Sequence, residues 1–186
     1  MARNYYDNPK HNEHVRTLSL LLFDQLEPLH HYSGFERDVL SAAAIVHDIG
    51  MAVGYNDHHK HGFYLLMETS LAGYSHREHA LIALLVRYHR KGSPSSEGID
   101  DVLEDGDMTR VSKLAALLRI AEYLERSKAQ RVRDLVCHVS DDYVQIEAVA
   151  DGGLQVEIHE ANLRKDLFES AYGATLEIVA SRSNPS

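Results

Sequence analysis

The stretch AAAIVHDIG, residues 42–50, decides how the first two-thirds of this sequence is interpreted. Its apolar residues continue a helical pattern that starts near Glu36, and His47 and Asp48 follow where that helix is expected to end, close to Gly50. An imidazole and a carboxylate therefore stand at the edge of a core. Because a buried carboxylate is costly unless it is paired or binds a metal, the pair indicates either a helix end that faces water or part of a metal site.

The segments on either side of this stretch predict further helices and then a small sheet. Apolar residues recur every three to four positions in four other segments, which are residues 13–26, 61–69, 75–89 and 109–128. After residue 130 the pattern changes to β-rich runs, which are residues 135–139, 143–149, 154–158 and 175–179, with a helix expected at 161–172. We expect a mainly α protein, with an all-helical domain over residues 1–130, a small α+β appendage over 131–180 and a disordered tail over 181–186.

The composition narrows the class of protein. The 186 residues carry a net charge of −9 and one cysteine, Cys137, which excludes a disulfide framework and a cysteine-rich zinc site and favours a reducing cytoplasm. The polar start MARNYYDNPKHN predicts no secretory signal, and no apolar run approaches the ~20 residues of a membrane helix. The negative charge argues against duplex nucleic acid or a membrane as the main partner, but it leaves room for a local basic pocket that takes a phosphorylated small molecule.

Histidine is over-represented, and its placement suggests a metal site. Eleven of the 13 histidines precede residue 90. Candidate ligands fall on different predicted elements, as in metal sites built inside helical bundles; they are His14, His47, Asp48, His58, His61, His89 and Glu122. Mixed imidazole and carboxylate ligands suit Zn, Mn, Fe, Ni or Co rather than Ca.

Several longer motifs carry a resemblance to a known family. They are AAIVHDIG (43–50), YNDHHKHGFYLL (55–66), LIALLVRYHRKG (81–92), KLAALLRIAEYLERS (113–127) and DLFESAYGATLEIV (166–179). The order of an early histidine, His47-Asp48 and a late acidic residue resembles the HD-domain metal-dependent phosphohydrolases. More closely, the chain from about His14 to Val179 is similar to the C-terminal HD domain of the exopolyphosphatase / guanosine pentaphosphate phosphohydrolase family.

This resemblance implies a fold and a set of site residues. It implies an HD-type helical bundle that holds one or two divalent ions (Mn, Fe, Ni, Co, Zn or Mg), with His47 and Asp48 central to catalysis. The implied metal ligands are His14, His47, Asp48, His61, His89 and Glu122, with His58 an open alternative to His61. Glu122 stands where many relatives have aspartate, which leaves its ligation open. Basic residues near these ligands in sequence are candidates for holding substrate phosphate, with solvated surface charge as the alternative; they are Lys60, Arg90, Lys91 and Arg119.

Three functions remain open from the sequence. The first is an enzyme, in which metal-activated hydroxide cleaves a phosphoester or phosphoanhydride bond of a nucleotide or polyphosphate-like substrate. The second is a non-catalytic module that binds polyphosphate or supports dimerisation, because the similar domain has that role in the larger family. The third is a metal-stabilised structural domain. The resemblance also suggests a homodimer.

Overall fold

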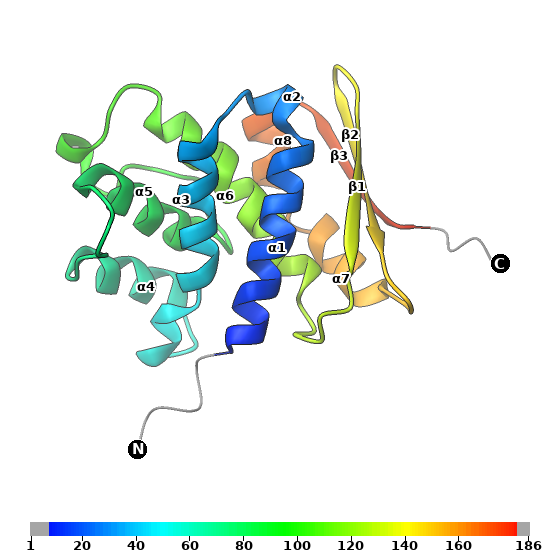
Figure 1. The fold of residues 1–186 in the computed structure, drawn as a ribbon, viewed down its shortest axis with the longest axis horizontal. Coiled ribbons are helices and arrows are strands. Elements are labelled where there is room, and N and C mark those ends of the chain that lie inside the picture. Colours follow the sequence, from blue (N-terminus) through cyan, green and yellow to red (C-terminus); the bar gives the residue numbers. More distant parts are fainter. Residues whose placement is uncertain (1–7, 182–186) are drawn as a thin grey trace.

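A computed structural model describes residues 8–181, and most of the predicted disordered tail lies outside the described residues. The described part is mainly helical, with one small sheet near its C-terminal end (Figure 1). In chain order the elements are α1 (Pro9–Gln25), α2 (Glu27–His30), α3 (Gly34–Val46), the 3₁₀ helix η1 (Ile49–Ala52), α4 (His58–Met67), α5 (His76–Tyr88), the 3₁₀ helix η2 (Asp100–Val102), α6 (Asp107–Leu124), β1 (Asp134–Val139), β2 (Tyr143–Val149), α7 (Gln155–Asn162), α8 (Asp166–Tyr172) and β3 (Thr175–Ala180). The predicted fold class is confirmed.

Helix α6 is the central element of the fold. It runs through the middle of the molecule in Figure 1 and packs against α1, α3 and α5 as well as α7 and α8. Every residue from Leu114 to Glu125 is buried, so this half of α6 is enclosed on all sides, where the sequence pattern indicated one apolar face. Polar residues on α6 therefore lie inside the protein. Between residues 8 and 181, no helix has the length and apolar character that crossing a bilayer requires.

The three strands form one sheet in the order β1-β2-β3. β1 and β2 are antiparallel neighbours, whereas β2 and β3 are parallel and are joined by a crossover through α7 and α8. Leu135, Ile146 and Ile178 face inward and belong to the same continuous core as the helical bundle. The helices end and the strands begin close to the predicted boundary at residue 130. The buried apolar residues on both sides of this boundary form a single core. The division into two domains stays a prediction.

One predicted strand is wrong. Residues 154–158 alternate between apolar and polar, but they begin helix α7, in which Glu157 and Ala161 are buried four residues apart. Two parallel strands must be joined by a long crossover, which is usually helical. Residues 154–158 lie in the crossover between β2 and β3, and this tertiary constraint outweighs the local alternation of five residues. The predicted helix over 161–172 is also divided, because α7 ends at Asn162 and α8 begins at Asp166.

Side chains cover both outer edges of the sheet. On β1, the amide of Gln25 donates to the Leu135 carbonyl at 2.7 Å and accepts from the Cys137 N–H at 2.9 Å. On β3, the amide of Asn162 bonds both the N–H and the carbonyl of Ile178. Because unpaired strand edges are templates for pairing with another chain, these amides favour a sheet that ends at β1 and β3.

Candidate metal centre

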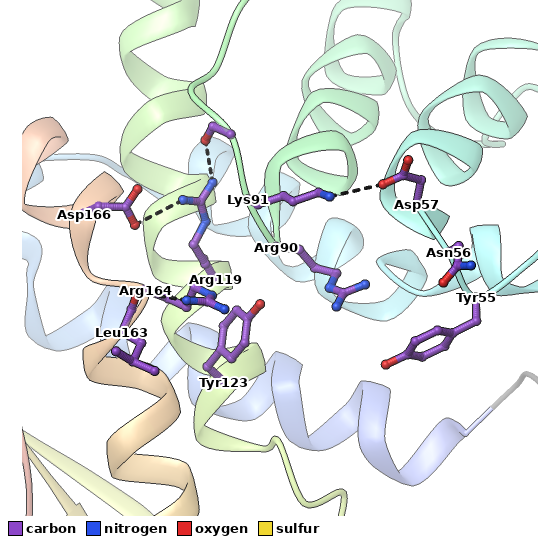
Figure 2. A pocket seen from close by; sticks show the side chains of 11 residues that line it. Tyr55, Asn56, Asp57, Arg90, Lys91, Arg119, Tyr123, Leu163, Arg164 and Asp166 are labelled. Atoms are coloured by element: carbon purple, nitrogen blue, oxygen red, sulfur yellow. Dashed lines mark hydrogen bonds and ion pairs between the residues drawn. The ribbon is translucent and has the colours of Figure 1, made fainter.

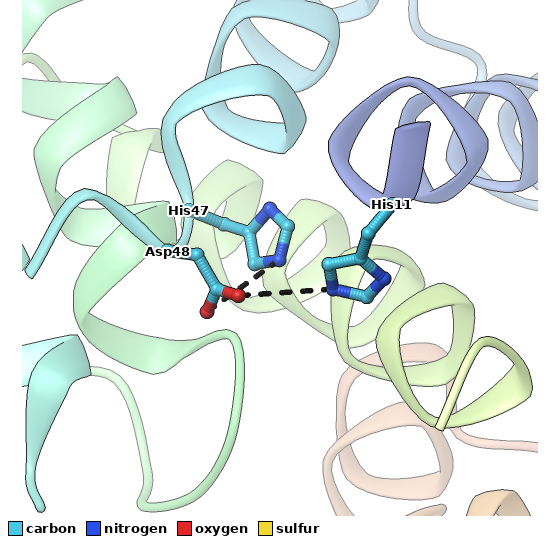
Figure 3. Close-up of side chains that lie close together, drawn as sticks. All are labelled: His11, His47 and Asp48. Carbon is cyan, nitrogen blue, oxygen red and sulfur yellow. Dashed lines mark ion pairs between the residues drawn. The ribbon is translucent and has the colours of Figure 1, made fainter. Parts of the chain in front are cut away.

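Four acidic or imidazole side chains from three helical segments converge at the lower end of the bundle. His11 comes from the first turn of α1, His47 and Asp48 follow the last residue of α3, and Glu122 comes from the enclosed half of α6. Glu122 Oε2 lies 3.1 Å from His11 Nε2 and 3.2 Å from His47 Nε2. His11 Nε2 is 3.8 Å from Asp48 Oδ2, and Figure 3 shows His11, His47 and Asp48 facing one another. Ligand atoms of these three residues lie within 4.8 Å of one another, the spacing of a group that could bind one ion.

A second group shares Asp48 with the first. It consists of Asp48, His58 at the start of α4 and His89 directly after α5, again with ligand atoms within 4.8 Å of one another. His58 Nε2 is 3.1 Å from Asp48 Oδ1 and 3.2 Å from His89 Nε2. A carboxylate placed between two sets of imidazoles is the arrangement that could bridge two divalent ions.

Three of the imidazoles are oriented in the same way by the backbone. The Nδ1 atoms of His47, His58 and His89 lie 2.7, 3.0 and 2.7 Å from the carbonyl oxygens three residues earlier, those of Ala44, Tyr55 and Val86. A carbonyl oxygen can only accept, so each Nδ1 carries a proton, and in the neutral ring each Nε2 presents a lone pair to the cluster. Histidines that bind metals almost always donate their other ring nitrogen in this manner.

The cluster is buried, and its inward atoms lack good partners. All of its residues are at most 5% exposed. The Nε2 atoms of His11 and His47, Asp48 Oδ1 and Glu122 Oε2 form no hydrogen bond of good geometry among the described residues. In addition, His58 Nε2 and His89 Nε2 lie 3.2 Å apart, and with both rings neutral and protonated at Nδ1 their lone pairs face each other. A cation relieves both conditions, so the donor set fits a divalent transition metal.

The pKa values of the cluster describe a site prepared for positive charge. Burial by itself would lower the pKa of His11, but the nearby carboxylates of Glu122 and Glu125 raise it to about 9. Burial opposes ionisation of Asp48 and Glu122, yet their contacts with the surrounding histidines hold the pKa of both carboxyl groups below the usual range. Burial lowers the pKa of His89 to about 3. The carboxylates are therefore ionised and His89 is neutral at pH 7, as metal ligands must be.

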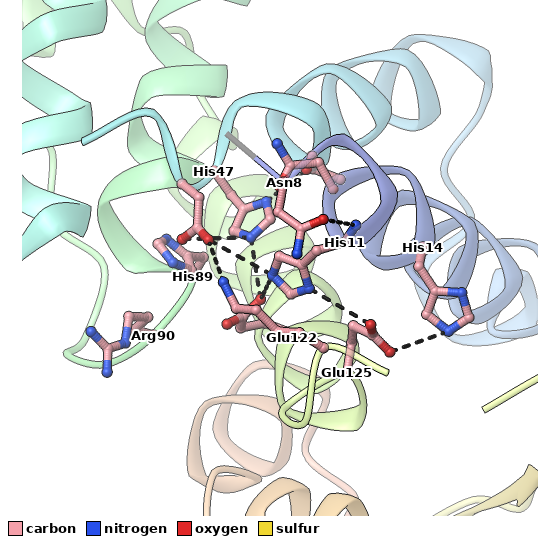
Figure 4. A network of polar contacts seen from close by, with 12 residues as sticks. Asn8, His11, His14, His47, His89, Arg90, Glu122 and Glu125 are labelled. Atoms are coloured by element: carbon pink, nitrogen blue, oxygen red, sulfur yellow. Dashed lines mark hydrogen bonds and ion pairs between the residues drawn. The ribbon is translucent and has the colours of Figure 1, made fainter. Parts of the chain in front are cut away.

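Outer residues hold the ligands in place (Figure 4). Glu125, which is 1% exposed, lies 3.9 Å from His11 Nδ1 through Oε1 and 3.5 Å from His14 Nε2 through Oε2. Lys128 Nζ lies 3.2 Å from Asp48 Oδ2. Glu125 thus links the two histidines of α1 to α6, and Lys128 neutralises one oxygen of Asp48 on the side that opens to solvent.

Two of the predicted ligands, His14 and His61, lie outside both groups, and two other histidines lie where they were expected. His11 occupies the place that was predicted for His14, because α1 begins at Pro9 rather than near residue 13. His14 lies one turn further along, 3.5 Å from Glu125 and outside both groups. Likewise His58, the alternative left open, lies in the second group, and His61 does not.

The remaining predicted ligands all lie in the cluster, and one sequence signal would have found His11. His47, Asp48 and His89 belong to the two groups, and Glu122 lies against the first. Asn8 followed by Pro9 is a helix-start pattern, and the Asn8 side chain accepts from the His11 N–H at 3.2 Å. A helix starting there places position 11 on the same face as position 14.

Of the four predicted substrate-binding residues, three line a cavity of about 630 Å³ beside the second group, and Lys60 does not (Figure 2). We call this cavity the cleft; its lining residues are Tyr55, Asn56, Asp57, Arg90, Lys91, Gly92, Arg119, Tyr123, Leu163, Arg164 and Asp166. Lys60 instead pairs with Asp57 at 3.3 Å. Arg119 is 1% exposed and donates to the carbonyls of Tyr88 and Gly92, so it also anchors the loop that carries Arg90 and Lys91.

Comparison with known proteins assigns the chain to a family. A family model described as Ppx/GppA phosphatase, domain III, matches residues 1–165. The chain belongs to this family. The expected kinship with exopolyphosphatases and guanosine pentaphosphate phosphohydrolases is thereby confirmed.

Curated relatives of this domain III chain share a name. A "Guanosine-5'-triphosphate,3'-diphosphate pyrophosphatase" of Pseudoalteromonas translucida (strain TAC 125) is 29% identical over 151 residues, which are 77% of this chain and 29% of the relative. One with the same name from Pseudoalteromonas atlantica (strain T6c / ATCC BAA-1087) is 31% identical over 124 residues, 63% of this chain and 24% of the relative. The chain thus spans 24–29% of the length of these two relatives.

Proposed function

We propose that this chain is an HD-type, metal-dependent phosphohydrolase that cleaves a phosphoester or phosphoanhydride bond of a nucleotide or polyphosphate-like substrate. The observation that carries the proposal is the common orientation of His47, His58 and His89, whose Nδ1 protons face carbonyls while their Nε2 atoms converge on Asp48. The printed name of the relatives, a nucleotide pyrophosphatase, supports the same reaction class.

In this proposal, each residue of the cluster has a defined task. His11, His47, Asp48 and Glu122 would hold one ion, and Asp48, His58 and His89 would hold a second. Divalent ions held there would stabilise charge on a phosphoryl oxygen and supply a water-derived nucleophile near neutral pH. Glu125 places a carboxylate 3.9 Å from His11 Nδ1 and favours its orientation through charge, and Lys128 limits the negative charge on Asp48.

Glu122 replaces the aspartate of many relatives, and its position supports a direct role. Its Oε2 lies within 3.2 Å of two imidazole nitrogens although the side chain is one methylene longer than aspartate. The extra length is taken up because Glu122 lies on the central helix, where it reaches across to α1 and α3. Glu122 therefore still provides a ligand at this position, which argues against the idea that the chain became a non-catalytic module by losing this ligand.

Metal content and turnover test the proposal. We expect purified protein to bind divalent metal and to hydrolyse phosphate esters or anhydrides, and Asp48→Asn to lose both metal and turnover. Two matched pairs test the ligand assignment: His11→Ala and His58→Ala should weaken metal binding about tenfold or more, whereas His14→Ala and His61→Ala should change it far less.

The outcomes separate the three functions. Metal without turnover on a phosphomonoester, a phosphodiester, a nucleotide or polyphosphate would indicate the structural domain. No metal together with polyphosphate binding would indicate the non-catalytic module. Full stoichiometric metal in Asp48→Asn would refute the site itself. A homodimer stays a prediction, and sedimentation of the purified chain would test it.

A further inference from the structure

The cleft carries unbalanced positive charge. Lys91 is neutralised by Asp57 at 3.2 Å, and Arg119 faces Asp166 at 3.5 Å. The other two basic residues, Arg90 and Arg164, have no carboxylate within 4.0 Å among residues 8–181, although both are half-buried. Because a partly buried guanidinium without a counter-charge is unfavourable, these two groups indicate an anion that the chain itself does not provide.

Aromatic rings hold both guanidiniums in place. Arg90 lies over the Tyr55 ring at 5.8 Å, and Arg164 lies over the buried Tyr123 ring at 5.1 Å. Cation–π contacts of this kind orient a guanidinium while leaving its N–H groups free to donate. The two arginines come from different walls, since Arg90 follows α5 and Arg164 lies in the turn between α7 and α8 (Figure 2).

The cleft adjoins the second group of candidate ligands. Arg90 follows His89 directly, and its Nη1 lies 3.5 Å from His58 Nδ1. The carbonyl of Tyr55, another residue of the cleft, accepts from the same Nδ1. A substrate with one phosphate at the cluster therefore has its remaining atoms beside Arg90 and, further along, Arg164.

Resting on the proposed function, we propose that the cleft is a second phosphate subsite, in which Arg90 and Arg164 bind a phosphate group other than the one that is hydrolysed. The site then selects oligophosphates, which carry at least two linked phosphate groups, over phosphomonoesters. Guanidinium donors suit phosphate because they form two parallel, charge-assisted hydrogen bonds. The chain as a whole carries a charge of −9, so general attraction does not explain anion binding, and the attraction must be local.

Two sources share this chemistry, namely nucleoside oligophosphates and inorganic oligophosphate. Tyr55 distinguishes them, because this residue of the cleft is 54% exposed and its ring can stack on a base. Because Tyr55→Leu also removes the ring beneath Arg90, it should weaken binding of both ligands, and it should weaken a nucleoside triphosphate clearly more than tripolyphosphate if the natural ligand is a nucleotide. A loss of affinity of the same size for both ligands would identify inorganic oligophosphate as the natural ligand.

The first test measures binding without catalysis. Calorimetric titration of the metal-free protein with inorganic tripolyphosphate should show binding, and Arg164→Ala should raise the dissociation constant about tenfold or more. Arg37→Ala is the matched control, because it removes the same charge from a surface pair with Asp24 away from the cleft; it should change the constant less than about twofold. Thermal unfolding confirms that each variant is folded, and Arg164→Lys, which keeps the charge, should retain part of the affinity.

The second test measures selectivity during turnover. Arg164→Ala should raise KM for an oligophosphate substrate about tenfold and leave KM for p-nitrophenyl phosphate within about twofold. The subsite is refuted if tripolyphosphate does not bind, or if Arg164→Ala binds it as Arg37→Ala does. If the protein shows no turnover with any metal, the proposed hydrolase fails, and the binding titration still decides the subsite.

Discussion

Replacing Gly50 by alanine should disturb both stability and the metal site, because the backbone of η1 touches the backbone of α4 at this glycine. A Cβ at position 50 would lie 1.9 Å from the His58 carbonyl oxygen and 2.4 Å from the Gly62 nitrogen. Ordinary contacts begin near 3.4 Å, so the two segments would have to separate by roughly 1.5 Å. Neither atom belongs to a flexible side chain that could turn away.

The expected loss follows from this geometry. Overpacking costs about 1–3 kcal/mol, and a clash with rigid backbone belongs at the upper end, so we expect about 3 kcal/mol. For a domain of this size that lowers the unfolding midpoint by about 6–12 °C. Because the displaced backbone carries His58, metal affinity should also fall about tenfold.

Thermal unfolding and metal titration of Gly50→Ala check this prediction. Gly34→Ala is the matched control, since a Cβ at Gly34 meets nothing within 4 Å, and its stability should stay within about 0.5 kcal/mol of wild type. If Gly50→Ala unfolds at the same temperature as Gly34→Ala and binds metal normally, η1 and α4 do not approach as described and the reasoning fails.

Two further predictions concern charge. His11 has its pKa raised from 6.5 to about 9 in the metal-free protein, so its contribution to stability is fully present below about pH 6.5 and is lost as the pH rises through 9. A metal ion must displace this proton, so the affinity for metal should increase from pH 7 to 9, by about tenfold per pH unit at most. Calorimetry in buffers of different ionisation enthalpy should detect about one proton released from His11 on metal binding. A binding reaction that releases no proton would contradict the assignment. Asp107 is fully buried and accepts two hydrogen bonds from Arg77 and one from Arg110, which hold its pKa below the ordinary value against the effect of burial. Asp107→Asn should destabilise the protein by about 2 kcal/mol at pH 7, and this difference should vanish in acid, where wild-type Asp107 is protonated; urea unfolding at several pH values measures it, and equal stability at pH 7 would refute the network.

Local sequence patterns predicted much of the helical bundle. The capping box of Ser75 and Glu78 is present at the start of α5, with Ser75 as the N-cap. The strands at 134–139, 143–149 and 175–180 also lie where β-rich runs predicted them. These signals work because a cap or a periodic face acts within one or two turns of the chain.

Contacts between residues that are far apart in the sequence account for what the local patterns failed to predict. Residues 154–158 form a helix because β2 and β3 are parallel and require a crossover. Arg164, the far guanidinium of the cleft, carries no local motif, since it gains its position only when the α7–α8 turn packs beside α6. Gln25 bonds the outer edge of β1, which lies 110 residues further along the chain. Asn162 bonds the outer edge of β3, which lies 16 residues further along.

The sequence by itself determined the helical class, the segment that carries His47 and Asp48, and the chemistry of imidazoles and carboxylates, because these depend on residue type and short-range spacing. Only the tertiary structure decided that His11 and His58, rather than His14 and His61, face Asp48, and that Glu122 reaches them from an enclosed helix. The physical reason is that neighbours three residues apart on a helix share a face, so the pattern cannot choose between them. The choice follows from where α1 begins and how closely η1 and α4 approach at Gly50.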